Sequence, residues 1–393
     1  MKQGWELKTL GDVCSVQRGL TYSGKDTVDY SSTVVLRATN IDLDSSSLVF
    51  DELKYLRDDF EIKEKYELKK GSLLICFSSG SKSHLGKVAL VDKHYKYAFG
   101  GFIGQITPSN NIDPKYLFYS LISEDYKSYI AQLTDGVNIN NLKIKDLQGF
   151  QIPVPPLEEQ KQIVAKLDQC FEAIDKAKAN ATKNLENAKE LFQSKLNEIF
   201  SQKGEGWVEK KLGAACLITM GQSPKGTSYN QEGEGVPLIN GPVEFGKDSF
   251  DKTIKSKFTT EPTKMCRQGD LILCVRGSTT GKINIAGFDA CIGRGVASIR
   301  FDQNQRWLDY FIRSKRNEIY SLGTGSTFPN VSRTILSKLP FLIPPVEQQN
   351  RLVETMNKLL SSTNLLQVKY QQELNSLEEL KKSILQKAFE GEL

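Results

Sequence analysis

The chain of 393 residues is long enough for about two or three compact domains, each with its own core. Hydrophobic residues make up 39% and charged residues 25%, which is typical of a soluble globular protein. The apolar runs are too short to span a bilayer and the N-terminal segment lacks the apolar core of a signal peptide, so we expect a cytoplasmic protein. The net charge of +5 permits a nucleic-acid partner without requiring one.

The cysteines and histidines favour neither a disulfide framework nor a metal site. Seven cysteines are scattered without close pairs, and there are two histidines. Cys14 and Cys216 occupy matching places in the repeat described below, as do Cys76 and Cys274. We expect these cysteines to be small buried hydrophobic residues, and we expect no metal or cofactor in this chain.

An internal repeat runs along the whole chain, and such a repeat has to be found before the fold is assigned. Gly4 and Trp5 recur as Gly206 and Trp207. Three further segments recur in the same order: KKGSLLICFSSGS (from Lys69) as RQGDLILCVRGST (from Arg267), KYLFYSLI (from Lys115) as RWLDYFI (from Arg306), and NLKIKDLQGFQIPVPP (from Asn141) as NVSRTILSKLPFLIPP (from Asn330). The chain therefore reads as globular unit, helix, globular unit, helix.

Each globular unit has the pattern of an α+β domain. Short runs of β-branched and aliphatic residues at 33–36, 73–77 and 87–91 are bounded by Gly and Ser, which predicts strands. The segments 116–122 and 307–312 are dense in aromatic and aliphatic residues and predict short core helices.

Each unit is followed by a repeated phrase and a long predicted helix. PPLEEQ begins at Pro155 and PPVEQQ begins at Pro344. Apolar residues then alternate steps of three and four, the seam pattern of a coiled coil, with polar Thr363 and Gln367 in the second seam. The predicted seam residues are Val164, Leu167, Phe171, Ile174, Leu185, Phe192, Ile199, Val353, Met356, Leu360, Leu374, Leu377 and Ile384.

Two seams in one chain predict that the helices pair. If the ends of each globular unit lie close together, the helices must run antiparallel and the C-terminus must return to the first unit. The alternative is that each helix packs only on its own domain. The predicted division is a first recognition-sized domain at 1–156, a central helix at 157–203, a second domain at 204–345 and a C-terminal helix at 346–393.

The sequence lacks the usual catalytic signatures. GSTTGKI at 277–283 resembles a phosphate-binding loop, but its glycines are too close together and Ile follows the Lys. Its counterpart GSKSHLGKV at 80–88 has a different length, which a hairpin loop tolerates and a phosphate loop does not. We therefore expect two hairpin loops and a chain that is not an enzyme.

Polar loops on the two domains are the candidate functional residues. The scaffold repeats while the loop residues diverge, so the two domains would read two different short DNA sequences through side chains suited to base edges and phosphates. Arg37, Asn40 and Asn240 are expected to be exposed. The full set of DNA-binding candidates is Arg37, Asn40, Ser78, Ser79, Lys82, Lys87, Asn138, Asn140, Asn240, Arg276, Ser278, Thr279, Lys282, Thr324, Ser326 and Arg333.

The chain resembles the specificity subunit of Type I restriction-modification systems over essentially its whole length. The resemblance is carried by the IPVPPLEEQ and LIPPVEQQ phrases, the GSLLIC and GDLILC strands and the terminal ILQKAFEGEL. It implies two target-recognition domains that each read half of a split site in double-stranded DNA, and an antiparallel coiled coil that fixes the spacer and docks two modification subunits. It also implies that the chain is not catalytic. S-adenosylmethionine chemistry would belong to the modification subunits, and restriction (helicase-nuclease) subunits would add ATP- and Mg²⁺-dependent steps.

Two other classes of function remain open at this point. A coiled-coil scaffold protein without DNA recognition would explain the helices but not the matched, divergent loops. A nucleotide-binding enzyme would need the GSTTGK loop to hold phosphate. Binding to duplex DNA distinguishes the first alternative, and a nucleotide titration distinguishes the second.

Overall fold

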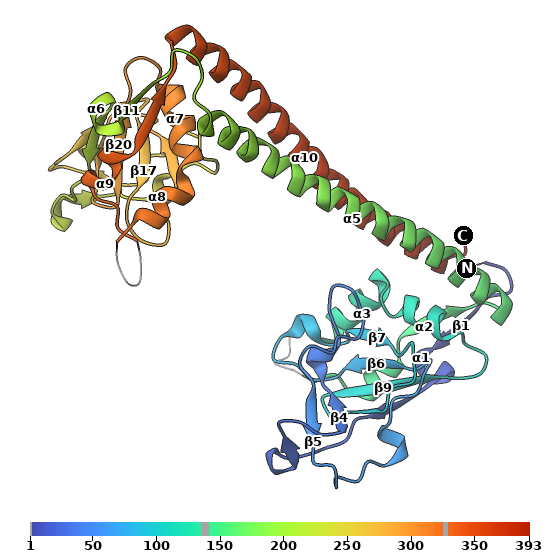
Figure 1. Ribbon diagram of the computed structural model, residues 1–393. Coiled ribbons are helices and arrows are strands. Elements are labelled where there is room, and N and C mark those ends of the chain that lie inside the picture. Colours follow the sequence, from blue (N-terminus) through green and yellow to red (C-terminus); the bar gives the residue numbers. More distant parts are fainter. Residues whose placement is uncertain (1, 135–140, 325–328) are drawn as a thin grey trace. The chain divides into compact units, whose positions relative to one another are not determined.

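The computed structural model describes residues 2–134, 141–324 and 329–393 (Figure 1). The chain forms two compact units. Unit 1 comprises Met1–Ala181 and Gln372–Leu393, and unit 2 comprises Thr182–Gln371. Each unit contains one α+β domain and one half of each of two long helices. Among the described residues, no helix is long and apolar enough to cross a membrane.

The domain of unit 1 is built from three small sheets. Their strand orders are β2-β9-β6-β7, β3-β5-β4-β8 and β1-β10. The strands are β1 (Glu6–Thr9), β2 (Cys14–Arg18), β3 (Thr27–Val28), β4 (Thr33–Leu36), β5 (Lys54–Leu56), β6 (Leu73–Cys76), β7 (Val88–Leu90), β8 (Tyr97–Phe99), β9 (Ile103–Pro108) and β10 (Gln151–Val154). The helices are α1 (Leu10–Val13), α2 (Pro114–Ser120), α3 (Glu124–Thr134) and α4 (Ile144–Gln148).

The domain of unit 2 has the same plan. Its strand orders are β12-β20-β17-β18, β13-β15-β14-β19-β16 and β11-β21. The strands are β11 (Val208–Lys211), β12 (Leu217–Met220), β13 (Tyr229–Asn230), β14 (Val236–Ile239), β15 (Phe258–Thr259), β16 (Met265–Cys266), β17 (Leu271–Cys274), β18 (Ile283–Ile285), β19 (Ala290–Ile292), β20 (Val296–Arg300) and β21 (Pro340–Ile343). The helices are α6 (Leu212–Ala215), α7 (Gln305–Ser314), α8 (Arg316–Leu322) and α9 (Arg333–Lys338).

The repeat seen in the sequence extends to the strand register. Leu73 of β6 pairs with Ile106 of β9, and Leu271 of β17 pairs with Ile299 of β20. The predicted strands at 33–36, 73–77 and 87–91 correspond to β4, β6 and β7, and the predicted core helices correspond to α2 and α7. The expected α+β class with two similar domains is therefore confirmed.

The central strands β6 and β17 are apolar throughout because each separates two cores. In β6, Leu73 and Ile75 pack in the cluster that also holds α2, while Leu74 and Cys76 pack in the cluster formed with the second sheet. The residues of β17 divide in the same way between two clusters. A strand buried on both faces reads as a continuous apolar run rather than as an alternating one.

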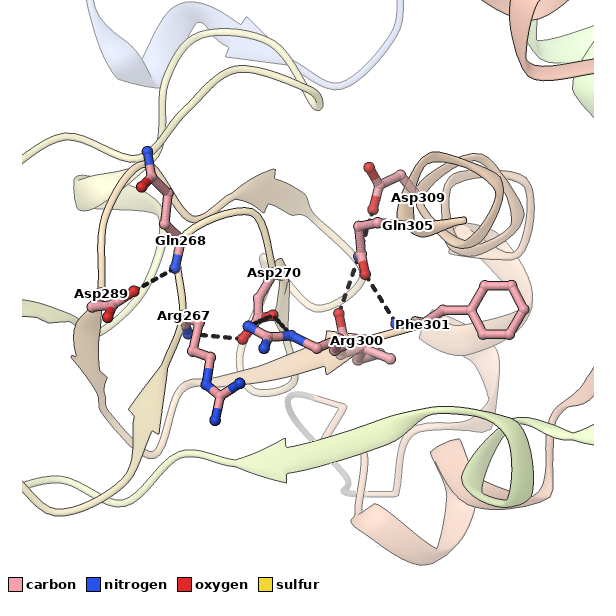
Figure 2. A network of polar contacts seen from close by, with 9 residues as sticks. Arg267, Gln268, Asp270, Asp289, Arg300, Phe301, Gln305 and Asp309 are labelled. Atoms are coloured by element: carbon pink, nitrogen blue, oxygen red, sulfur yellow. Dashed lines mark hydrogen bonds and ion pairs between the residues drawn. The ribbon is translucent and has the colours of Figure 1, made fainter. Parts of the chain in front are cut away.

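The two domains support their central strands with different polar groups, and Figure 2 shows those of unit 2. In unit 2, the Asp270 carboxylate accepts hydrogen bonds from the Arg267 N–H at 2.9 Å and the Arg300 Nε at 2.6 Å. In unit 1, the Ser72 hydroxyl takes the place of Asp270 and donates to Gln105 Oε1 at 2.9 Å. At this place a neutral hydrogen bond in unit 1 therefore replaces the ion pair of unit 2, although the backbone around it is shared.

The repeated proline phrase ties each long helix to its own domain. The helices are α5 (Leu157–Ser201) and α10 (Val346–Glu390). The last residue of each phrase, Gln160 or Gln349, is fully buried, and its Nε2 donates to the carbonyl of the first proline, Pro155 at 2.9 Å or Pro344 at 2.8 Å. Gln160 Oε1 also accepts from the backbone N–H of Asp113 at 2.8 Å. The phrase is thus a helix-start motif that fixes where α5 and α10 leave the domains.

Helices α5 and α10 run antiparallel, as the seams predict. In unit 1, Lys178 pairs with Glu378, and Asp175 lies 3.5 Å from Lys381, so numbers rise along one helix while they fall along the other. The expected return of the C-terminus is also confirmed, because Phe389 contacts Tyr116 of the first domain with ring centroids 5.2 Å apart.

The predicted seam residues are buried to different degrees. Buried ones are Val164, Leu167, Phe171, Ile174, Phe192, Val353 and Met356; half-buried ones are Leu185, Ile199, Leu360, Leu374, Leu377 and Ile384. The polar seam residue Thr363 is also buried, and its hydroxyl donates to the Leu360 carbonyl at 3.0 Å. The hydroxyl of Thr363 therefore has its hydrogen-bond partner within the same turn of α10.

The helices also pack on the domains, which the seam pattern alone did not predict. Leu196 and Phe200 lie outside the predicted seam but are buried, and the Phe200 ring lies 4.6 Å from that of Trp307. In unit 1, the Phe171 ring lies 5.4 Å from that of Tyr119. The alternative that each helix packs only on its own domain is wrong, because each helix contacts both its partner helix and a domain.

All seven cysteines are free, and the two matched pairs of the repeat are buried as predicted. Burial raises the pKa of the Cys14 and Cys216 thiols to about 12. These side chains therefore pack as neutral hydrophobic groups.

Candidate nucleic-acid interface

The candidate loops of each domain meet at one end of its central strand. In unit 1, the backbone N–H of Leu142 donates to the Phe77 carbonyl at 2.7 Å, and Ser78 forms a β-bridge with Asn141. In unit 2, the N–H of Val331 donates to the Val275 carbonyl at 2.9 Å, and Arg276 forms a β-bridge with Asn330. Ser78 and Arg276 therefore occupy the same place in the two frames.

In unit 1, an arginine closes this end of the sheet. The Arg18 guanidinium lies over the Phe77 ring, 4.9 Å from its centroid. It donates to Asn141 Oδ1 at 2.8 Å and to the Leu142 carbonyl at 2.9 Å, while the Ser78 hydroxyl donates to the same Asn141 oxygen at 2.7 Å. Asn141 thus links the loop after β6 to the end of β2.

A cavity of about 360 Å³ lies beside this cluster. Its lining includes Arg18, Arg37, Ser78, Phe102 and Asn141. Arg37 follows β4 directly, and its terminal nitrogen donates to the Glu52 carbonyl at 3.1 Å. Its Nε is buried and has no hydrogen-bond partner among the described residues. The cavity therefore combines two cationic side chains, Arg18 and Arg37, with an aromatic ring.

Two of the predicted site residues in unit 1 are used inside the domain. Asn40 was expected to be exposed, and that prediction is wrong: it is 1% exposed. Its Oδ1 accepts from the Arg37 N–H at 2.8 Å and its Nδ2 donates to the Val49 carbonyl at 3.0 Å, so it shapes the 3-10 turn η2 (Ala38–Asn40). Lys87 is half-buried, and its Nζ donates to the Ile41 carbonyl at 2.6 Å. Burial lowers the pKa of the Lys87 ammonium group.

The other candidates of unit 1 remain at the loop surface. Lys82 is exposed, and its Nζ donates to the Thr134 carbonyl at 3.1 Å. Ser79 is half-buried, and its hydroxyl accepts from the Ser81 N–H at 3.2 Å. Asn138 and Asn140 lie outside the described residues.

In unit 2, the loop between β17 and β18 is the hairpin that the sequence predicts. The Cys274 N–H donates to the Lys282 carbonyl at 2.8 Å, and the Gly281 N–H donates to the Cys274 carbonyl at 2.9 Å. Thr280 closes the loop from inside, because its buried hydroxyl donates to the Gly277 carbonyl at 2.8 Å. The side chains of Arg276, Ser278 and Lys282 are left exposed, and Thr279 is half-buried.

The remaining candidates of unit 2 lie on other segments of the domain. Asn240 is half-buried and follows β14 in the way that Arg37 follows β4, and its N–H donates to Glu244 Oε2 at 3.1 Å. Thr324 is exposed and pairs with Asn330 through the backbone. Arg333 is exposed at the first turn of α9. Ser326 lies outside the described residues.

Several residues of this interface were missed in the sequence. Arg18, Phe102 and Asn141 meet in unit 1 from three distant segments, and Arg294 is exposed in the unit 2 turn that corresponds to the one bearing Phe102. Asn141 carried a signal, because it begins a repeated segment opposite Asn330. The other three stand at non-repeating positions, and sequence spacing gave no sign that they are neighbours.

No catalytic centre is evident among these residues. Within the described ranges, no group of three or more His, Cys, Asp or Glu side chains is placed to hold a metal ion. The surface is made instead of arginine, lysine, serine and asparagine side chains, which hydrogen-bond to phosphates and base edges.

The chain belongs to the family defined by the Type I restriction modification DNA specificity domain, which matches residues 2–187 and again residues 204–376. Among its relatives is the type I restriction enzyme MjaX specificity subunit of Methanocaldococcus jannaschii, 30% identical over 100% of this chain and 94% of the relative. The EcoKI specificity subunit of Escherichia coli is 26% identical over 100% of this chain and 90% of the relative.

Solved structures agree with this assignment. A chain from a structure on the complex assembly and conformational transition of the type I R-M system superposes with a TM-score of 0.85 at 25% identity, covering 100% of this chain and 99% of that chain. The HsdS subunit of Thermoanaerobacter tengcongensis gives a TM-score of 0.68 at 25% identity, covering 100% and 98%. Family and relatives favour DNA recognition over the scaffold alternative, and they mark the chain as a specificity component rather than a catalytic one.

Proposed function

We propose that the chain is the specificity subunit of a Type I restriction-modification complex, in which each domain reads one half of a bipartite site in double-stranded DNA. The observation that carries this proposal is the shared frame with divergent side chains. Ser78 bridged to Asn141 in one domain corresponds to Arg276 bridged to Asn330 in the other. A common backbone would present each domain to DNA in the same way, while different side chains would select different bases.

In this proposal the domains are residues 1–156 and 204–345, and the helices at 157–203 and 346–393 set the spacer and dock two modification subunits. The solvent-facing side of α10 supports a docking role, because Leu365, Leu366 and Val368 are 56%, 38% and 55% exposed. Neighbouring exposed apolar side chains of this kind are typical of protein interfaces.

The chemistry would then belong to other subunits. Modification subunits would use S-adenosylmethionine, and restriction subunits would use ATP and Mg²⁺. As the DNA-reading component of such a complex, the chain would work in the cytoplasm.

A domain swap tests the division of labour. Residues 206–343 are replaced by the equivalent stretch of a relative, and the methylation motif is sequenced in cells that express the chain with its modification subunits. We expect one half of the split motif to change and the other half, with its spacer, to stay. The matched control replaces 1–150 and should change only the opposite half. A change in both halves from either swap, or the absence of any split motif, contradicts the proposal.

A further inference from the structure

One turn in each domain holds a single large side chain out into solvent at the candidate interface. In unit 1 it is the turn between β8 and β9, where Phe102 is 70% exposed. In unit 2 the corresponding turn lies between β19 and β20, where Arg294 is exposed. Neither residue is needed by the core of its domain, so folding does not explain why it is there.

The turn that bears Phe102 is fixed by its backbone. The Phe102 carbonyl accepts from the N–H of Phe77 at 2.9 Å and from the N–H of Ser78 at 3.0 Å. Gly19 packs so closely on the Gly100 carbonyl that a Cβ there would clash. The backbone that carries the phenyl ring is therefore fixed, and little backbone entropy would be lost when a partner covers the ring.

The ring stands beside groups suited to nucleic acid. Phe102 lines the cavity of about 360 Å³ together with Arg18, Arg37 and Asn141. Arg37 carries a guanidinium group, one terminal nitrogen of which donates to the Glu52 carbonyl at 3.1 Å. An apolar ring next to two arginine side chains suits the DNA major groove, where thymine methyl groups lie close to acceptor atoms and phosphates.

The turn of unit 2 admits one side chain only, and that side chain is basic. A Cβ at Gly293 would clash with the Asn240 side chain, and a Cβ at Gly295 would clash with the Asn240 carbonyl. Arg294 between them is free to project, and its N–H is held by the Ser223 hydroxyl at 3.2 Å. The same turn thus offers an aromatic ring in one domain and a guanidinium in the other.

We propose that Phe102 and Arg294 are specificity-determining residues, with Phe102 contacting the methyl group of a thymine in the first half-site and Arg294 pairing with a guanine in the second. This rests on the proposed function, since it requires that the domains read DNA. Apolar contact with the thymine methyl and the paired contact of arginine with guanine O6 and N7 are the readouts that suit these two side chains in the major groove.

Uracil substitution tests the contact of Phe102, because uracil lacks only the methyl group of thymine. The complex of the full chain with its modification subunits is titrated with a duplex carrying its own motif, and then with duplexes in which each thymine of the first half-site is replaced singly. We expect one replacement to weaken wild-type binding about three- to tenfold. Phe102→Ala should lose a similar factor on the thymine duplex and be indifferent to that replacement.

Arg294→Ala is the matched control, because it changes the equivalent turn of the other domain. It should leave the uracil effect in the first half-site intact and relax selection for one guanine in the second. Since both side chains are exposed, both variants should keep the wild-type thermal transition.

Three results overturn the inference while leaving the proposed function standing. Wild-type binding could be insensitive to every uracil replacement in the first half-site. Phe102→Ala could retain the full uracil effect. Phe102→Ala could weaken binding equally on unrelated duplexes, which would make the ring a sequence-blind wedge. Failure of the wild-type complex to bind any duplex, in contrast, removes the proposed function itself.

Discussion

A buried carboxyl group should make the stability of the second domain depend on pH. Asp309 lies on α7 and is 3% exposed. Gln305 Nε2 donates to its Oδ1 at 3.0 Å, as Figure 2 shows, and an Arg306 guanidinium nitrogen lies 3.7 Å from its Oδ2. Burial raises the pKa of Asp309 to about 7, against the opposing effects of Gln305 and Arg306. The sequence repeat puts Phe118 at this place in the first domain, so the ionisable group is particular to the second.

The direction of the change in stability with pH depends on whether the folded or the unfolded state binds the proton of Asp309 more tightly. The folded carboxyl has a pKa of about 7 and the unfolded one 3.8, so protons favour the folded state between these values. The stabilisation is full below pH 3.8 and is lost as pH rises to about 7. At 1.36 kcal/mol per pKa unit, the total loss is about 4 kcal/mol.

Asp309→Asn removes the ionisation while keeping the acceptor for Gln305. We expect the variant to be about 4 kcal/mol more stable than the wild type at pH 8 and nearly equal to it at pH 4. The assay is urea unfolding at several pH values, with hydrogen exchange used to separate unit 2 from unit 1. Asp302→Asn removes an exposed carboxylate just before α7 and is the matched control. Its free energy of unfolding should change with pH as that of the wild type does. If the free energies of unfolding of Asp309→Asn and the wild type change equally with pH, Asp309 is ionised in the folded domain and is stabilised by Arg306.

Two further predictions concern the interface and the helices. Arg276→Ala should cost about 1–3 kcal/mol of discrimination at one base position. Lys282→Ala should weaken binding to all duplexes and lower the slope of log K against log salt concentration by about one unit. Titrations at several salt concentrations distinguish the two effects, and equal losses on all sequences would mean that Arg276 contacts only a phosphate. Inserting four residues after Ala181 and four after Leu374 lengthens both antiparallel helices by about 6 Å, close to one turn. Methylation-motif sequencing should then show a spacer longer by about one or two base pairs with unchanged half-sites, at about 3.4 Å per base pair; an unchanged spacer would mean that the helices hold partners without measuring DNA.

The surface of the candidate site was only partly predictable, because exposure depends on contacts between distant segments. Asn40 reads as a loop residue in the sequence, but its side chain is buried against Val49 and caps a turn. Lys87 was a candidate for DNA binding, but its ammonium group donates to the Ile41 carbonyl inside the domain. Arg18 and Asn141 form a hydrogen bond although they are 123 positions apart in the sequence. The residues next to each of them give no indication of this contact.

Short-range patterns in the chain were enough to predict the long helices and the hairpin loops. The seam periodicity and the proline phrases predicted helices whose observed starts are Leu157 and Val346, because helix periodicity and proline geometry are local. The unequal glycine spacing at 80–88 and 277–283 predicted hairpins for the same reason. Three features became visible only in the fold. They are which side chains face solvent, the packing of Leu196 and Phe200 in the domain core, and the equivalent turns that carry Phe102 and Arg294. Those outcomes depend on packing between residues far apart in the chain, which no local pattern encodes.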